Sequence, residues 1–91
     1  MGERFRIRGN GLEWRRVEDE IVALNLPSET YLGVNRTGAS LWQALSDGAS
    51  EAELVQLLVD QYAIATADAE RDVREFVAAL QAQGVLESIP E

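Results

Sequence analysis

The chain changes its hydrophobic pattern at Asn35, and this change limits the folds open to it. Before Asn35, apolar residues alternate with polar ones or cluster in β-branched runs, as they do in the strands of a small sheet. After Asn35, apolar residues recur every three or four positions, as they do along one face of a helix. The order predicts an α+β fold of the winged helix-turn-helix type, with a three-stranded antiparallel sheet followed by three α-helices.

The sheet is predicted from three strand-like segments, which are residues 12–17, 20–26 and 30–34. Asp19 provides the turn between the first two segments. Pro27-Ser28-Glu29 provides the next turn, because proline fixes φ at a value that suits a tight turn. The third segment therefore pairs back on the second as a hairpin.

Each predicted helix has a start signal and an apolar face. The first follows Asn35, a good N-cap, and ends at Asp47-Gly48. The second begins at a capping box formed by Ser50 and Glu53. The third begins near Thr66, carries acidic residues in its first turn and ends before Gly84, which leaves Val85-Leu86 as a hydrophobic closure. The apolar faces contain Leu41, Trp42 and Leu45 in the first helix, Leu54, Leu57, Leu58 and Tyr62 in the second, and Ala69, Val73, Phe76, Val77 and Leu80 in the third.

Composition limits the chemistry that the chain can perform. Its 91 residues include no Cys and no His, so thiol nucleophiles, imidazole bases, disulfides and thiolate zinc sites are excluded. A domain of this size also has little room for a catalytic cleft, and we expect no enzyme activity, no cofactor and no metal. No apolar run reaches the roughly 18 residues of a membrane span, and the polar N-terminus does not resemble a signal peptide. We therefore expect a soluble cytoplasmic protein without a membrane partner.

The charge distribution argues against DNA binding. Residues 1–36 hold six Arg and six acidic residues, a net charge of zero, whereas residues 37–91 hold two Arg and ten acidic residues, a net charge of −8. A recognition helix must approach a duplex that carries one negative charge per about 1.7 Å of its axis. The acidic third helix is unsuited to that task, so a winged-helix DNA-binding regulator is the less favoured alternative and no nucleic-acid partner is expected.

The segment around Asn35 resembles the PqqD family of peptide chaperones, which includes the leader-peptide recognition elements of ribosomally made, modified peptides. The resemblance begins with the string YLGVNxxGAxxWxxL at residues 31–45. It continues through Leu24-Asn25-Leu26, through the spaced apolar residues of the second helix and through DVxxFVxxL at residues 72–80. It covers about residues 12–88, and one departure from the family pattern is Pro27-Ser28-Glu29 at a turn where the family often has glycine. Residues 1–10 are assigned to an N-terminal arm, for which flexibility is the expectation, and residues 11–91 to the PqqD-like domain.

The resemblance implies that a leader peptide adds as an antiparallel strand to the third strand, beside the third helix. An unpaired strand edge offers free amide and carbonyl groups to an extended peptide, and neighbouring side chains then set its register. For lasso-peptide leaders the family implies that a Tyr and a Pro of the leader fill apolar pockets near the third helix. Trp42 is expected in the core, not in the site. The expected peptide-binding residues are Thr30, Tyr31, Leu32, Gly33, Val34, Ala69, Asp72, Val73, Phe76 and Val77.

The resemblance also implies a processing enzyme as a second partner. In lasso-peptide pathways a small leader-binding protein presents the precursor to a leader-cleaving cysteine protease. In pyrroloquinoline quinone synthesis it presents its peptide to a radical SAM enzyme. The short chain without a fused enzyme favours the lasso setting, and the radical SAM setting is the alternative.

Overall fold

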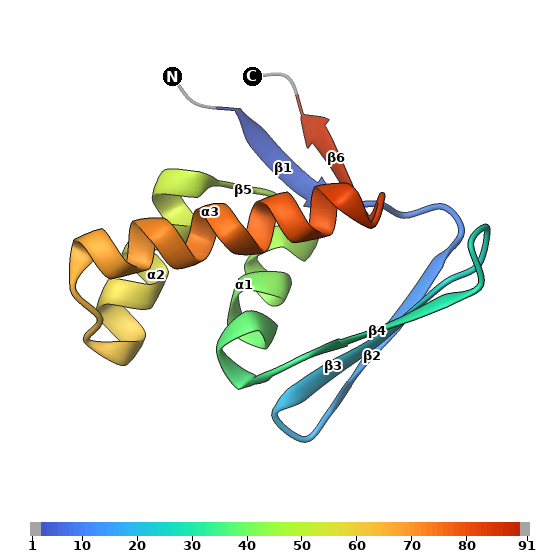
Figure 1. Cartoon of the computed structure of the whole chain (residues 1–91), viewed down its shortest axis with the longest axis horizontal. Coiled ribbons are helices and arrows are strands. Elements are labelled where there is room, and N and C mark those ends of the chain that lie inside the picture. The colour runs from blue at the N-terminus through green and yellow to red at the C-terminus, as the bar shows by residue number, and fades with distance from the viewer. Residues whose placement is uncertain (1–2, 90–91) are drawn as a thin grey trace.

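The computed structural model describes residues 3–89, which form two small antiparallel sheets and three helices (Figure 1). The α+β class, with a three-stranded antiparallel sheet followed by three helices, is confirmed. The elements in chain order are β1 (Arg4–Ile7), β2 (Leu12–Val17), β3 (Glu20–Asn25), β4 (Thr30–Val34), α1 (Arg36–Asp47), β5 (Ala49–Ser50), α2 (Glu51–Tyr62), α3 (Thr66–Ala82) and β6 (Leu86–Ile89).

The larger sheet has the order β2-β3-β4, and its strands begin and end close to the predicted positions. In the register, Ala23 of β3 lies opposite Trp14 of β2 and Leu32 of β4. Side chains alternate along each strand, so Ile21 and Ala23 are fully buried while Val22 is exposed. One face of this sheet therefore packs on the core and the other is open to solvent.

The smaller sheet corrects the assignment of residues 1–10 to an arm outside the domain. Arg4–Ile7 form β1, which pairs with β5 on one side and with β6 on the other. Phe5 and Ile7 alternate with arginines and are each only 5% exposed. Burial of these two side chains makes β1 part of the core. Residues 1–2 of the assigned arm lie outside the described residues.

The helix starts follow the sequence signals. Asn35 Oδ1 accepts a hydrogen bond of 2.9 Å from the Gly38 amide at the start of α1. Ser50 and Glu53 form the predicted capping box of α2, with amide-to-side-chain distances of 2.9 and 3.2 Å. α3 starts at Thr66 without a side-chain cap, since its N-cap position is Ala65.

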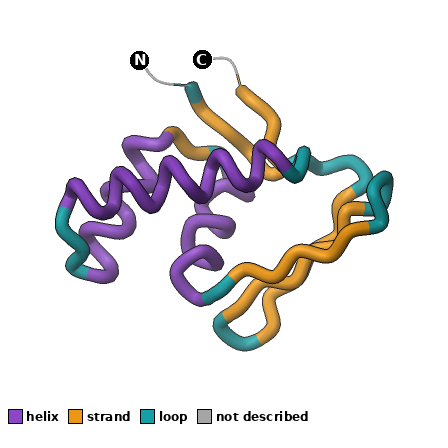
Figure 2. Tube along the Cα trace, viewed as in Figure 1, coloured by secondary structure: helices purple, strands orange, loops and turns teal. Residues whose placement is uncertain are grey.

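The three helices form one group, and the two sheets lie on different sides of it (Figure 2). α1 contacts β1 of the smaller sheet and β3 of the larger one, and α2 packs against α3. Trp42 and Leu45 of α1 are fully buried at this junction, as predicted for Trp42. Val85 is also buried, but the residues after it form β6, a strand that the sequence did not reveal. None of the helices within residues 3–89 combines the length and hydropathy needed to cross a membrane.

Candidate functional site

The β4 edge, formed by the backbone of Thr30–Val34, is the first part of the candidate site. β4 is the last strand of its sheet and pairs only with β3 among the described residues. Its five residues carry no charged side chain, and neither proline nor a bulge interrupts it. Natural sheets usually protect such an edge with charges, prolines or bulges. The β4 edge is therefore suited to accept another extended chain.

A cavity of about 330 Å³ lies near the C-terminal end of β4. Phe76 and Asp72 reach it from α3, and Leu41 lines it from α1. The remaining lining residues come from the start of α1, from α2 and from the loop that precedes α3, and they are Asn35, Thr37, Gly38, Leu58 and Ile64. We call this hollow the Phe76 cavity. Four of its eight lining residues are apolar, and the others are polar or glycine, with one carboxylate, so it is suited to an amphipathic side chain such as that of a tyrosine.

Gly38 joins the Phe76 cavity to the end of β4. A Cβ atom on Gly38 would lie 2.5 Å from Val34 Cγ1 and 3.1 Å from Phe76 Cε1. Glycine is therefore required for Val34 and Phe76 to approach α1 this closely. The contact brings β4, α1 and α3 together at one end of the β4 edge.

The structure divides the predicted residues of α3 into two groups. Ala69, Val73 and Val77 are at most 2% exposed and lie in the core. Asp72 and Phe76 are partly exposed and line the Phe76 cavity. Residues four apart share one helix face, so the core group and the cavity group lie on adjacent faces of α3.

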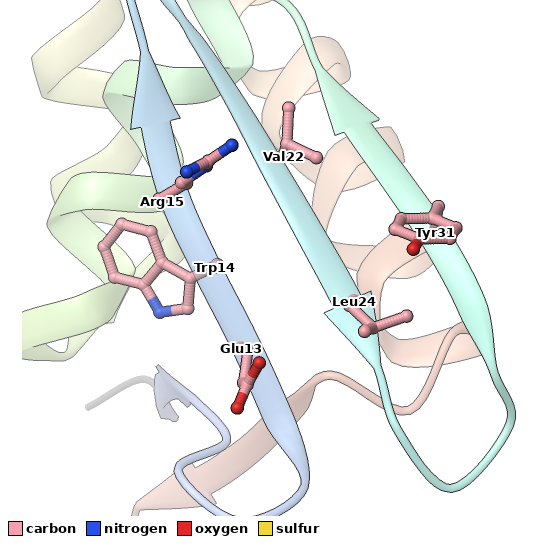
Figure 3. A pocket seen from close by; sticks show the side chains of 6 residues that line it. All are labelled: Glu13, Trp14, Arg15, Val22, Leu24 and Tyr31. Atoms are coloured by element: carbon pink, nitrogen blue, oxygen red, sulfur yellow. The ribbon is translucent and has the colours of Figure 1, made fainter.

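The predicted residues of β4 also lie on two faces. Val34 is buried and Leu32 is half buried on the inner face, whereas Tyr31 is 76% exposed on the outer face opposite Leu24. A second hollow, of about 370 Å³, lies on this outer face and is lined by the side chains of Tyr31, Leu24 and Val22, with Glu13 and Arg15 of β2 (Figure 3). Trp14 also lines it, but its ring packs on the inner face of the sheet. The side chain of Tyr31 thus belongs to the outer face of the sheet, although its backbone belongs to the β4 edge.

Three charged side chains on one part of α3 pair with one another. Arg71 lies 3.4 Å from the Asp72 carboxylate and 3.6 Å from that of Asp68. Both pairs are exposed, and such pairs contribute little to stability. Within residues 3–89 no three side chains of the metal-ligating types gather to hold an ion. The site offers a strand edge and a neighbouring hollow of mixed polarity, and these features are typical of peptide binding.

Six residues that line the Phe76 cavity were not among the predicted site residues, and they are Asn35, Thr37, Gly38, Leu41, Leu58 and Ile64. Asn35 was interpreted as a helix cap, and the structure confirms that its side chain caps α1. Leu41 and Leu58 were assigned to apolar helix faces, and both are buried. Only the packing of three helices shows that these residues also meet at one hollow.

The fold and the site define a small α+β domain in which an edge strand, open on one side among the described residues, lies near a helix. A family profile described as "Coenzyme PQQ synthesis protein D (PqqD)" matches residues 20–86. Because this match covers well over half of the chain, the chain belongs to the PqqD family. A comparison with curated protein sequences finds no match.

Two solved structures resemble the whole fold. One is TbiB1 in complex with the TbiA(beta) leader peptide, with 29% sequence identity and a TM-score of 0.84, covering 94% of this chain and 99% of that one. The other is a lasso peptide synthetase B1 complexed with the leader peptide, with 32% identity and a TM-score of 0.79, covering 94% of this chain and 98% of that one. The resemblance to a PqqD-like leader-peptide recognition element is thereby confirmed.

Proposed function

We propose that the chain binds the leader segment of a ribosomally synthesised precursor peptide by strand addition to the β4 edge. The observation that carries this proposal is the unpaired, uncharged β4 edge beside the Phe76 cavity. Backbone hydrogen bonds along β4 would supply affinity, and the cavity would supply side-chain specificity. Two structural neighbours that were solved with leader peptides support this function.

The topology gives the direction of the bound leader. β4 runs from Thr30 toward α1, so an antiparallel leader strand runs from the Val34 end to the Thr30 end. The N-terminal part of the bound leader segment then lies beside the Phe76 cavity, where one of its apolar or aromatic side chains is seated. Its C-terminal part leaves near the turn between β3 and β4, and the core peptide continues from there.

The proposal is tested by calorimetry with a synthetic leader of the short precursor encoded beside the gene for this chain. We expect one leader per chain and no binding of the isolated core peptide. Equal affinity for leader and core, or tighter binding to duplex DNA than to leader, would overturn the proposal. The acidic residues of α3 already argue against the DNA alternative.

We also propose that the chain, without a catalytic step of its own, delivers the bound leader to a cytoplasmic processing enzyme. A leader-cleaving cysteine protease of a lasso-peptide pathway is favoured because both structural neighbours are leader complexes and one is described as a lasso peptide synthetase B1. A radical SAM enzyme is the alternative that the family description supports. The exposed apolar side chains on the outer face of the larger sheet, Tyr31 and Val22 among them, are candidates for contact with that enzyme.

Delivery is tested by the rate of precursor cleavage with the protease encoded beside this gene. We expect the wild-type chain to accelerate cleavage, and we expect Tyr31→Ser to bind leader normally while accelerating cleavage less. A rate that does not depend on this chain would exclude delivery to that protease.

A further inference from the structure

Asn25, at the end of β3, is the only polar residue in the buried class within residues 3–89, with 7% exposure. Both ends of its side-chain amide are hydrogen-bonded. Asn25 Oδ1 accepts a hydrogen bond of 2.9 Å from Arg8 Nη2, and Asn25 Nδ2 donates one of 3.0 Å to the carbonyl oxygen of Gln83. A buried amide is costly unless both of its ends are paired, so this network restricts the segments that supply the partners to one arrangement.

Arg8 extends the network to the end of α3. Its Nη1 donates to the Gly84 carbonyl at 2.7 Å, and its backbone amide donates to the Val85 carbonyl at 2.8 Å. Gln83 is the C-cap of α3, and its carbonyl, which lacks a partner within the helix, is the one that Asn25 bonds. Arg8 bonds the two residues that follow it. We call the four residues Arg8, Asn25, Gln83 and Gly84 the Arg8 clasp. It joins the segment before β2, the end of β3 and the segment that follows α3.

The position of the clasp relates it to the β4 edge. Asn25 lies opposite Thr30 in the β3–β4 ladder, so the clasp lies at the Thr30 end of β4. At the other end of β4, Val34 and Phe76 meet at Gly38. Between these two points, contacts between α3 and the larger sheet are few. The clasp and the Gly38 contact therefore fix α3 relative to the two ends of β4.

We propose that Arg8 and Asn25 are positioning residues for the leader peptide, although neither lines the Phe76 cavity. The inference rests on the proposed function. By holding the end of α3 at a fixed distance from the Thr30 end of β4, the clasp keeps the space beside the β4 edge ready for an incoming strand. A chain without the clasp must spend part of its binding free energy on ordering these elements, so its affinity for the leader is lower.

The experiment measures leader affinity and the spacing of α3 from the sheet in the same variants. Asn25→Asp retains an acceptor for Arg8 but loses the donor to the Gln83 carbonyl, and Arg8→Ala removes the guanidinium group. Arg6→Ala is the matched control, because Arg6 is an exposed arginine of β1 whose side chain bonds to Glu87 of β6 and to no other side chain within residues 3–89. Since the chain has no Cys, spin labels can be placed at Glu13→Cys and Gln81→Cys, which are exposed positions on β2 and α3.

We expect Asn25→Asp and Arg8→Ala to weaken binding of the synthetic leader about tenfold, within the range typical of coupling between separate sites. The label-to-label distance distribution should broaden in both variants and narrow again when leader is bound. Arg6→Ala should change neither quantity. A melting curve of each variant identifies a temperature at which that variant is folded, and affinity and distance are measured there. Because the two clasp variants remove different hydrogen bonds, one of them that folds is enough to test the inference.

Unchanged affinity and an unchanged distance distribution in a folded clasp variant would overturn the inference, even if that variant melts at a lower temperature. That result would make the clasp a purely structural feature and leave the proposed function intact. A wild-type chain that binds no leader would instead overturn the proposed function itself.

Discussion

The indole rings of Trp14 and Trp42 meet edge to face, with ring centroids 5.8 Å apart and ring planes at 71°. Trp14 lies on the inner face of the larger sheet, and Trp42 is fully buried in α1. This contact joins the sheet that carries the β4 edge to the helix that follows it. This pair is one of the contacts that attach the sheet of the candidate site to the core, together with the buried Ile21 and Ala23 of β3.

Trp42→Ala is expected to impair folding. Truncation of a buried Trp costs about 3–5 kcal/mol, a large share of the stability of a small domain. The loss should appear as a sharply lower melting temperature or as no soluble protein. Trp42→Phe is the control, because it keeps an aromatic ring and removes the buried Nε1 group, which has no hydrogen-bond partner in the described structure. A Trp42→Ala chain with wild-type stability and weak leader binding would show that Trp42 belongs to the site and not to the core.

Leu32→Pro is expected to weaken leader binding in a chain that still folds in reduced yield. Leu32 lies in the middle of β4, opposite Ala23. Proline has no backbone N–H, so the substitution removes one hydrogen-bond donor, either from the ladder with β3 or from the edge that the leader would use. We expect a loss of about 1–3 kcal/mol in leader binding, measured by calorimetry. Leu32→Ala keeps the amide and removes only the side chain. Equal losses in the two variants would assign the effect to side-chain packing and not to strand addition.

Glu53 predicts a specific dependence of stability on pH. Its pKa lies below the usual value of 4.5, chiefly because its carboxylate accepts a hydrogen bond from the Ser50 amide. Desolvation opposes this shift, and the neighbouring Arg4 guanidinium adds to it. A lowered pKa in the folded state gives stability that is present above the unfolded-state pKa and is lost as the pH falls through the folded-state pKa. We expect Glu53→Gln to melt below the wild type at pH 7.

The difference between Glu53→Gln and the wild type should shrink as the pH falls below about 4.5. Glu51→Gln, in the same helical turn, is the control, because Glu51 is not part of the capping box. A difference for Glu53→Gln that stays constant from neutral to acidic pH would show that the capping box does not depend on the carboxylate charge.

The larger sheet and the starts of α1 and α2 were predictable because their signals are local, whereas α3, which has no side-chain cap, was predictable from its apolar periodicity. Asn35 and Ser50 are caps whose partners lie three residues away, and the turn at Pro27 separates two strand-like runs. A single sequence contains such signals within a few residues. The structure therefore agrees with the predictions for these elements to within about two residues.

The smaller sheet was not predictable for the opposite reason. β1 pairs with β6 from the other end of the chain, with Arg4 opposite Ile89. Each strand has only four residues, and its apolar positions have meaning only when the partner is known. The clasp was hidden in the same way, because Arg8 and Gly84 are brought together by that pairing.

The candidate site was predictable by element but not by side chain. The interpretation of the third strand and third helix as the site agrees with the placement of the β4 edge and the Phe76 cavity. The apolar stripe of α3 does not reveal which members face the core. Val73 and Phe76 are both large, apolar and three residues apart, and only the packing of α2 against α3 separates their roles.

Val73→Asp and Phe76→Asp should therefore have different effects. From the sequence, Val73 is expected to contact both the core and the leader. In the structure Val73 is 1% exposed, so Val73→Asp places a carboxylate in the core and should cost about 3 kcal/mol of folding free energy or more. Phe76 is partly exposed in the cavity wall, so a carboxylate at that position can reach water and most of the fold should survive. That carboxylate would instead stand beside Asp72 and face an apolar leader side chain, so leader binding should weaken by about 1–3 kcal/mol.

Thermal melts and leader titrations of both variants provide the measurement. Normal leader binding by folded Phe76→Asp would exclude the Phe76 cavity from the leader site, and a folded, stable Val73→Asp chain with weakened binding would restore the original assignment of Val73.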